Sequence, residues 1–123
     1  MASGIMHGKR GLIIGLANAK SMAWGEALKK RVEPLADELG AMVVGHLDVT
    51  DPESMDAVFS HLERVWGRLD FIVHAVAFSD KNELSGRYVD TTHENFMRTM
   101  DISVYSLTDV TRRAEPLMTN GGS

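Results

Sequence analysis

Residues 11–25 read Gly11-Leu12-Ile13-Ile14-Gly15-Leu16-Ala17-Asn18-Ala19-Lys20-Ser21-Met22-Ala23-Trp24-Gly25. An apolar β-branched run that ends in glycine and continues through small residues into helix formers predicts a strand, a tight turn and a helix. Gly15 has the conformational freedom that the turn needs, and the small residues after it let another molecule approach the backbone. The amide groups and the positive end of the helix would face an anion. The stretch therefore predicts a phosphate-binding turn of a dinucleotide site.

The spacing in this turn departs from the usual dinucleotide fingerprint, which has three closely spaced glycines. Here the pattern is Gly15-x5-Ser21-x3-Gly25. An ordinary strand–helix turn with a glycine hinge is the alternative interpretation of the same residues. The turn alone leaves both interpretations open.

Composition narrows the class of protein. The chain has 123 residues, enough for one domain at most and few for a complete dinucleotide-binding enzyme. With 13 basic and 17 acidic residues the net charge is −4, which disfavours a nucleic-acid partner. The lack of cysteine excludes disulfides, thiolate metal sites and a cysteine nucleophile, and the histidines show no metal-ligand spacing. No stretch approaches the roughly 18 apolar residues of a membrane span, so we expect a cytoplasmic protein without a membrane partner.

Apolar runs and helical patterns alternate along the chain. The predicted strands are residues 12–15, 41–47 and 69–75, the predicted helices are 21–39, 51–66 and 94–118, and a polar loop covers 78–92. Near-continuous apolar strands that alternate with helices predict an α/β fold, in which helices cover both faces of a parallel sheet.

Two features do not fit a complete domain. Pro34 lies inside the predicted helix 21–39, where it should cost about 3 kcal/mol unless the helix kinks. An acidic residue for the ribose is expected about 20 positions after the turn, at a strand end, but that region is helical here. Either Asp48, after the strand 41–47, is this acid, or a strand is missing between Gly25 and Glu26. Periodicity leaves both possibilities open.

Four segments together resemble a known family, the bacterial NADH-dependent enoyl-acyl-carrier-protein reductases of the short-chain dehydrogenase/reductase superfamily. The segments are residues 15–25, 46–49, 70–78 and 101–106. The turn Ser21-x-Ala23-x-Gly25 and the strand end Val73-His74-Ala75-x-x-Phe78 distinguish this family from ordinary members of the superfamily. The resemblance implies a Rossmann-type doubly wound parallel sheet. It also implies hydride transfer from NADH to a trans-2-enoyl thioester, carried by acyl-carrier protein or coenzyme A, in fatty-acid biosynthesis, and a homotetramer.

The chain departs from this family in two places. The rest of the first helix and the second strand, which the family has after the glycine turn, are absent between Gly25 and Glu26. The chain also ends at Ser123, before the catalytic tyrosines and the cofactor-holding lysine of the family, and neither Tyr88 nor Tyr105 belongs to a Tyr-x6-Lys arrangement. We therefore expect residues 1–123 to be a single, partial dinucleotide-binding domain that contains no catalytic residue and is inert alone.

The resemblance assigns ligand contacts to residues that match the family's motifs. Residues of the turn would line the pyrophosphate and nicotinamide side, Asp48 would accept from the adenine amine, and Ile102 would pack near the adenine. Ala75 and its two successors would pass close to the ribose. The implied cofactor contacts are Gly15, Ala17, Ser21, Met22, Asp48, Val49, Ala75, Val76, Ala77 and Ile102, and Ser79 would lie near the acyl substrate.

Each of these roles has a structural alternative. Asp48 is equally well interpreted as a turn or capping aspartate. His74 is interpreted as a core histidine whose hydrogen bonds are satisfied, in preference to a base. Ser103 is interpreted as a packing or hydrogen-bonding residue. An apolar stripe on the last helix either covers the sheet or contacts another subunit; its residues are Phe96, Met100, Val104, Leu107 and Val110. Another short-chain reductase acting on ketones or alcohols, and a non-catalytic nucleotide-binding fragment, remain the alternative functions.

Overall fold

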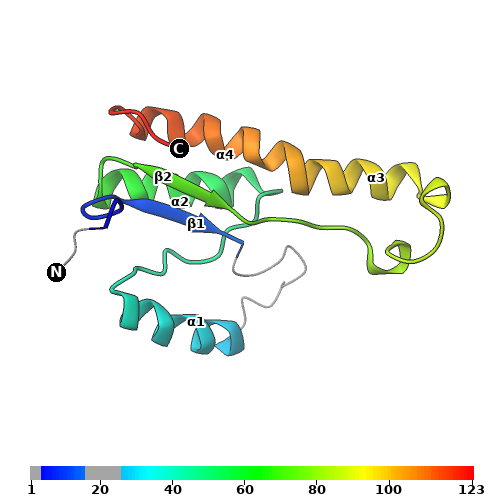
Figure 1. Ribbon diagram of the computed structural model, residues 1–123, viewed down its shortest axis with the longest axis horizontal. Coiled ribbons are helices and arrows are strands. Elements are labelled where there is room, and N and C mark those ends of the chain that lie inside the picture. Colours follow the sequence, from blue (N-terminus) through cyan, green and yellow to red (C-terminus); the bar gives the residue numbers. More distant parts are fainter. Residues whose placement is uncertain (1–3, 16–25) are drawn as a thin grey trace.

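The structure is a computed structural model that describes residues 4–15 and 26–123, and Figure 1 shows their arrangement. The strands are β1 (Gly11–Ile14) and β2 (Phe71–His74), and the α-helices are α1 (Glu26–Leu39), α2 (Pro52–Val65), α3 (His93–Met100) and α4 (Ser106–Ala114). A π-helical segment, η3 (Asp101–Tyr105), joins α3 to α4, and short 3-10 turns are η1 (Lys81–Glu83), η2 (Tyr88–Asp90) and η4 (Glu115–Leu117). In the part of the chain thus described, no helix is long and apolar enough to cross a membrane.

The two strands pair in parallel, as predicted, with Gly11 opposite Phe71 and Ile14 opposite His74. The sheet continues on the other side of β2. There Ser123 donates its N–H to the carbonyl of Asp70 at 3.3 Å and accepts from the N–H of Ile72 at 2.9 Å. Bonds from one residue to positions two apart on its neighbour are the slanted pattern of parallel strands. Ser123 therefore adds a further parallel pairing to the sheet.

Helix α2 supplies the centre of the core. Asp51 accepts from the N–H of Glu53 at 3.0 Å and Pro52 occupies the first turn, so the predicted start of this helix is confirmed. The apolar residues of α2 are buried against β1 and α4, in a cluster made by Leu12, Ile14, Met55, Val58, Phe59, Leu62, Leu69, Val110, Ala114 and Leu117. Val65, which the pattern also placed on the apolar face, is half exposed in the last turn.

Helix α1 ends where the sequence predicts. Gly40 adopts a φ of +64°, its N–H binds the carbonyl of Asp37, and the N–H of Ala41 binds the carbonyl of Ala36 at 2.7 Å. This left-handed glycine cap closes the helix. Pro34 lies within the helix, which continues past it to Leu39. The predicted beginning of this helix at Ser21 lies outside the described residues.

The predicted strand 41–47 is wrong. Residues 41–48 have no regular secondary structure, and the described sheet consists of β1 and β2. Val44, Leu47 and Val49 nevertheless pack against the core. The apolar pattern therefore reported burial correctly, but a strand also needs a neighbour that pairs with it, and β1 does not pair with this segment.

Within residues 4–15 and 26–123, one face of the sheet is covered well and the other is not. The layer of α2 and α4 covers Leu12 and Ile14, whereas Ile13 is 56% exposed and its partner Val73 is 44% exposed on the opposite face. Helix α1 lies apart from the α2–α4 layer (Figure 1), and none of its described side chains joins the core cluster. The described residues therefore confirm the expected helical cover for one face of the sheet.

Candidate functional site

Gly15 and Ala75 meet where β1 and β2 end. The N–H of Ala75 donates to the carbonyl of Ile14 at 2.9 Å, and Gly15 has a φ of +109°. A Cβ at residue 15 would lie 2.0 Å from the carbonyl oxygen of Ala75. Only glycine fits this conformation and this close approach. The carboxyl end of a parallel sheet is also where open α/β folds bind their ligands.

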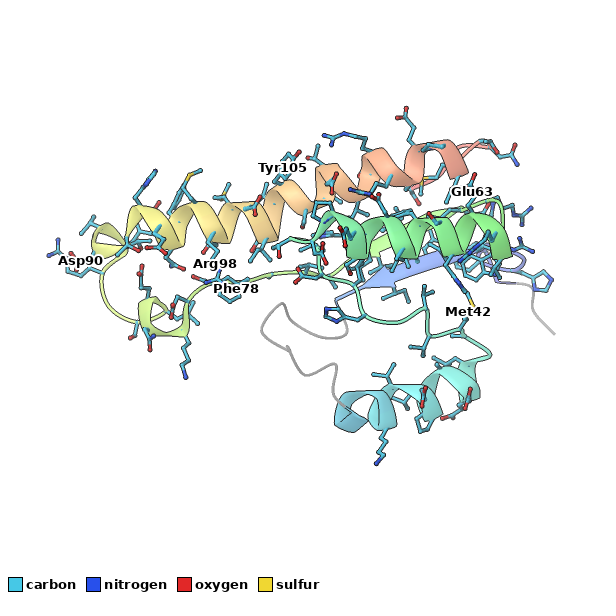
Figure 2. All side chains as sticks on the ribbon, turned by 180° about the vertical axis from the view of Figure 1, so that it is seen from behind. Met42, Glu63, Phe78, Asp90, Arg98 and Tyr105 are labelled. Carbon is cyan, nitrogen blue, oxygen red and sulfur yellow. The ribbon has the colours of Figure 1, made fainter. Side chains whose placement is uncertain are left out.

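The segment after β2 exposes small residues at the same end of the sheet. Ala75 and Ala77 are exposed, whereas Val76 between them is half-buried and packs against the core. Phe78 is buried, and the guanidinium of Arg98 lies 4.8 Å from the centre of its ring, as Figure 2 shows from behind. Residues 75–77 therefore form an edge with small exposed side chains, and a large ligand can approach its backbone closely. We call these three residues the edge at 75–77.

Asp48 is held in a turn before α2. Its Oδ1 accepts from the N–H of Thr50 at 2.8 Å and from the Oγ1 of Thr50 at 2.7 Å, and its own N–H donates to the Oγ of Ser54. The interpretation as a turn aspartate is therefore confirmed. Both contacts use Oδ1, and no hydrogen bond from residues 4–15 or 26–123 reaches Oδ2. Because α2 leads by a short connection into β2 and packs against the sheet, its beginning lies toward the carboxyl ends of the strands (Figure 1). The hydrogen bond to Ser54 holds Asp48 at this beginning.

The other predicted ligand contacts differ in how exposed their side chains are. Val49 is half-buried against the core. Ile102 is 2% exposed in η3, so its side chain offers no open surface. Ser79 is half-buried, and its Oγ bonds to the side chains of Asn95 and Thr99. The predicted contacts Ala17, Ser21 and Met22 lie outside the described residues.

His74 is the core histidine that the alternative interpretation predicted. Its Nε2 lies 2.8 Å from the Oγ of Ser106, and this hydroxyl donates its proton to the carbonyl of Ile102 at 2.6 Å. Because a carbonyl only accepts, the hydroxyl has no proton left for the imidazole, and Nε2 must carry the hydrogen. His74 thus bonds within the core, and in residues 4–15 and 26–123 no group of acidic or histidine side chains could hold a metal ion.

The segments α3, η3 and α4 form one long helix, and its apolar stripe does not cover the sheet. Phe96, Met100, Val104 and Leu107 are about half exposed, and only Val110 is buried. A neighbouring face, about 100° round the helix, carries small polar residues that bond to β2 and the segment after it. Of these, Ser103 was expected to form hydrogen bonds, but Asn95 and Thr99 were missed. Their signal is the recurrence of small polar residues at spacings of four, four and three from Asn95 to Ser106.

Glu83 accepts hydrogen bonds from Thr92, the residue that caps the beginning of α3. Its two carboxylate oxygens accept from the N–H of Thr92 at 3.0 Å and from the Oγ1 of Thr92 at 2.7 Å, while Thr92 caps the helix by accepting from the N–H of Asn95. These hydrogen bonds from Thr92 hold the pKa of Glu83 below its usual range. The ionised carboxylate therefore stabilises the fold above the unfolded-state pKa of about 4.3, and this contribution is lost as the pH falls through the lowered value.

We predict that Glu83→Gln makes unfolding less dependent on pH. The stability of the wild-type chain should fall more steeply than that of the variant between about pH 5 and pH 3, because only the wild type has this carboxylate to protonate. Urea unfolding at several pH values measures the slope. Glu63→Gln, at an exposed position of α2, is the control and should keep the wild-type slope. Equal slopes for Glu83→Gln and the wild type would contradict the prediction.

Comparison with known proteins identifies a family that matches most of the chain. The family model described as enoyl-(acyl carrier protein) reductase matches residues 15–123. The enoyl-acyl-carrier-protein reductase (NADH) 1 of Rhizobium meliloti is 58% identical over 140 aligned positions, which cover 99% of this chain and 52% of the relative. Because the alignment is longer than the 123 residues of this chain, at least 17 residues of the relative have no counterpart within it.

Solved structures match equally well. The enoyl-acyl-carrier-protein reductase of Anaplasma phagocytophilum, in complex with NAD, is 53% identical with a TM-score of 0.83, covering 95% of this chain and 52% of that one. The enzyme of Aquifex aeolicus is 39% identical with a TM-score of 0.83, covering 96% and 59%. The chain spans about half the length of the curated relatives it matches. The two parallel strands are thus part of a Rossmann-type α/β fold, and the chain belongs to the enoyl-acyl-carrier-protein reductase family of the short-chain dehydrogenase/reductases.

Proposed function

We propose that the protein containing this chain reduces the double bond of a trans-2-enoyl thioester with NADH in fatty-acid biosynthesis, and that this chain binds the cofactor. The contact between Gly15 and Ala75 carries the proposal, because it leaves backbone without side chains at the ligand-binding end of the sheet. The name of the Rhizobium meliloti relative supports NADH as the cofactor and an acyl-carrier-protein thioester as the substrate. A coenzyme A thioester is the alternative carrier.

The proposed cofactor contacts follow the shape of this end of the sheet. Gly15 and the edge at 75–77 give the ribose and pyrophosphate close access to the backbone, and the family resemblance adds Ala17, Ser21 and Met22. The Oδ2 of Asp48, to which no described residue bonds, would accept from the adenine amine, with Val49 beside it and Ile102 as a buried wall behind. Ser79 would lie near the acyl substrate.

When bound, NADH supplies the hydride for the β-carbon of the thioester. The contribution of this chain is to bind the cofactor and to fix its orientation, which lowers the entropic part of the barrier. We assign no catalytic role to any of its residues.

We further propose that a strand is missing between Gly25 and Glu26. At least 17 unmatched residues in the Rhizobium meliloti relative support this, as does the apolar segment 41–47, which packs on the core without a strand to pair with. The intact mass of the purified protein tests whether these residues are deleted.

The exposed stripe of α3 and α4 supports a homotetramer, in which a second subunit would cover Phe96, Met100, Val104 and Leu107. Light scattering of the full-length protein measures this, and a monomer would contradict it. The cytoplasm is the proposed compartment, and a chain without cysteine needs no oxidising compartment to form disulfides.

The test of function is the oxidation of NADH by the full-length protein. We expect oxidation with a crotonyl thioester and none with simple ketones. Activity on ketones instead would favour another short-chain reductase. Absence of NADH binding would favour a non-catalytic protein and would reject the proposal.

Asp48→Asn tests the adenine contact. We expect the Kd for NADH to rise about tenfold, because the variant loses a hydrogen bond to a charged acceptor, while its amide oxygen can still accept from Thr50. Calorimetric titration of the full-length protein measures the Kd. Asp51→Asn is the matched control, since asparagine also caps a helix and, among the described residues, the side chain of Asp51 bonds only to the N–H that it caps. An unchanged Kd in Asp48→Asn would place the adenine elsewhere.

A further inference from the structure

One face of the long helix is fastened to β2 and to the segment that follows it. Asn95, Thr99, Ser103 and Ser106 bond in turn to residues 80, 79, 78 and 74, and we call these four residues the polar ladder. Asn95 accepts from the N–H of Asp80 at 2.9 Å and donates to the Oγ of Ser79 at 3.2 Å. The ladder thus runs from the end of the strand out to residue 80.

Ser103 makes the most specific contact of the ladder. Its Oγ accepts from the N–H of Phe78 at 2.9 Å and donates to the carbonyl of the same residue at 3.2 Å. One hydroxyl therefore bonds to both backbone groups of a buried residue that lies outside the strands and helices. Ser103 lies in the π-helical segment η3, and such widened turns inside α-helices are frequent at functional sites.

The residues to which the ladder bonds lie on both sides of the edge at 75–77, where we propose that the cofactor binds. His74 is held by Ser106 on one side, and Phe78 is held by Ser103 and covered by Arg98 on the other. The hydrogen bonds of the ladder go to residues 74 and 78–80, on either side of residues 75–77. Their position therefore depends on how firmly both ends are held, in the same way that a rigid support positions a binding loop.

We propose that Ser103 and Asn95 are positioning residues, which hold residues 78–80 against the helix and thereby fix the edge at 75–77 for the cofactor and the acyl substrate. The proposal rests on the proposed function for the identity of these ligands. The fastening of the segment itself rests on the hydrogen bonds alone.

Ser103→Ala in the full-length protein tests the role. We expect faster amide hydrogen exchange at Phe78 and a Kd for NADH raised about tenfold, the size expected when a net hydrogen bond is lost. The KM for a crotonyl thioester should rise with it, and kcat should change by less than about twofold, because no reacting group is removed. Ser103→Thr keeps the hydroxyl and should restore the wild-type exchange and Kd.

Thr111→Val is the matched control. Its hydroxyl bonds to the carbonyl of Leu107 at 2.7 Å on an exposed side of α4, so the variant loses a helix hydroxyl without touching the segment after β2. We expect wild-type exchange at Phe78 and a wild-type Kd. Wild-type values in Ser103→Ala, or equal changes in Ser103→Ala and Thr111→Val, would overturn the positioning role.

The two proposals fail in distinguishable ways. If the wild-type protein binds no NADH while Ser103→Ala still accelerates exchange at Phe78, the proposed function is wrong and the fastening of the segment stands. If Ser103→Ala does not fold, Asn95→Asp replaces it, since it keeps the acceptor for Asp80 and loses the donor to Ser79. The same exchange and Kd measurements then decide, with an unchanged result again overturning the role.

Discussion

Replacing Gly15 with alanine is expected to weaken NADH binding by the full-length protein about 100-fold and to lower the free energy of unfolding by about 2–6 kcal/mol. A φ of +109° strains any residue with a Cβ, and this Cβ would lie 2.0 Å from the carbonyl oxygen of Ala75. Residue 75 must then move, together with its hydrogen bond to Ile14. Calorimetric titration and urea unfolding measure the two effects.

Gly86→Ala separates backbone strain from the contact with Ala75. Gly86 has a similar φ of +103°, but a Cβ there would meet nothing within 4 Å. We expect a loss of stability of about 1 kcal/mol from the strain alone, with NADH binding unchanged. If Gly15→Ala bound NADH as well as Gly86→Ala does, the close approach of the two strand ends would have no part in binding.

Leu62→Ala is expected to have a similarly large effect on stability alone. Leu62 is 1% exposed on α2, within the core cluster that also contains β1 and α4 residues. Removing its side chain leaves a cavity and should cost about 2–5 kcal/mol, a large part of the stability of a small domain. Val65→Ala, at a position 49% exposed on the same helix, should cost less than about 1 kcal/mol. Urea unfolding that gives equal losses would contradict the packing of α2 described above.

The elements that the sequence predicted well are those specified by local chemistry. Asp51 and Pro52 mark the beginning of α2 through capping and a fixed φ, and Gly40 marks the end of α1 through its left-handed conformation. The apolar runs at β1 and β2 also predicted their parallel pairing, because a strand that alternates with helices has few other ways to be buried.

The wrong predictions have one physical origin. The hydrophobic pattern of a segment indicates that it can be buried, but it does not identify the strand or helix against which the segment packs. The segment 41–47 is apolar and packs on the core, yet it forms no strand without a neighbour to pair with. Ile13 and Val73 have the composition of buried strand residues and are about half exposed. For Asn95 and Thr99 the spacing of small polar residues marks one face of the helix, but it does not identify their partner, a segment 15 to 20 residues away in the chain.

In the candidate site, too, some features could be predicted from local residues and others could not. The turn at Gly15 was predicted from its residues, whereas the contacts at Asp48, Ala75 and Ile102 came from the family resemblance and not from spacing. For Asp48, the turn that the structure shows and the adenine contact that we propose use different oxygens of one carboxylate, so the two interpretations that the sequence left open are compatible.

Hydrogen–deuterium exchange of the full-length protein, with and without NADH, would locate the cofactor. If the carboxyl ends of β1 and β2 hold it, exchange should slow at residue 15, at 48–49 and at 75–77, and stay unchanged along residues 56–63 of α2. Binding of NADH without protection at these positions, or no binding at all, would contradict a cofactor site at this end of the sheet.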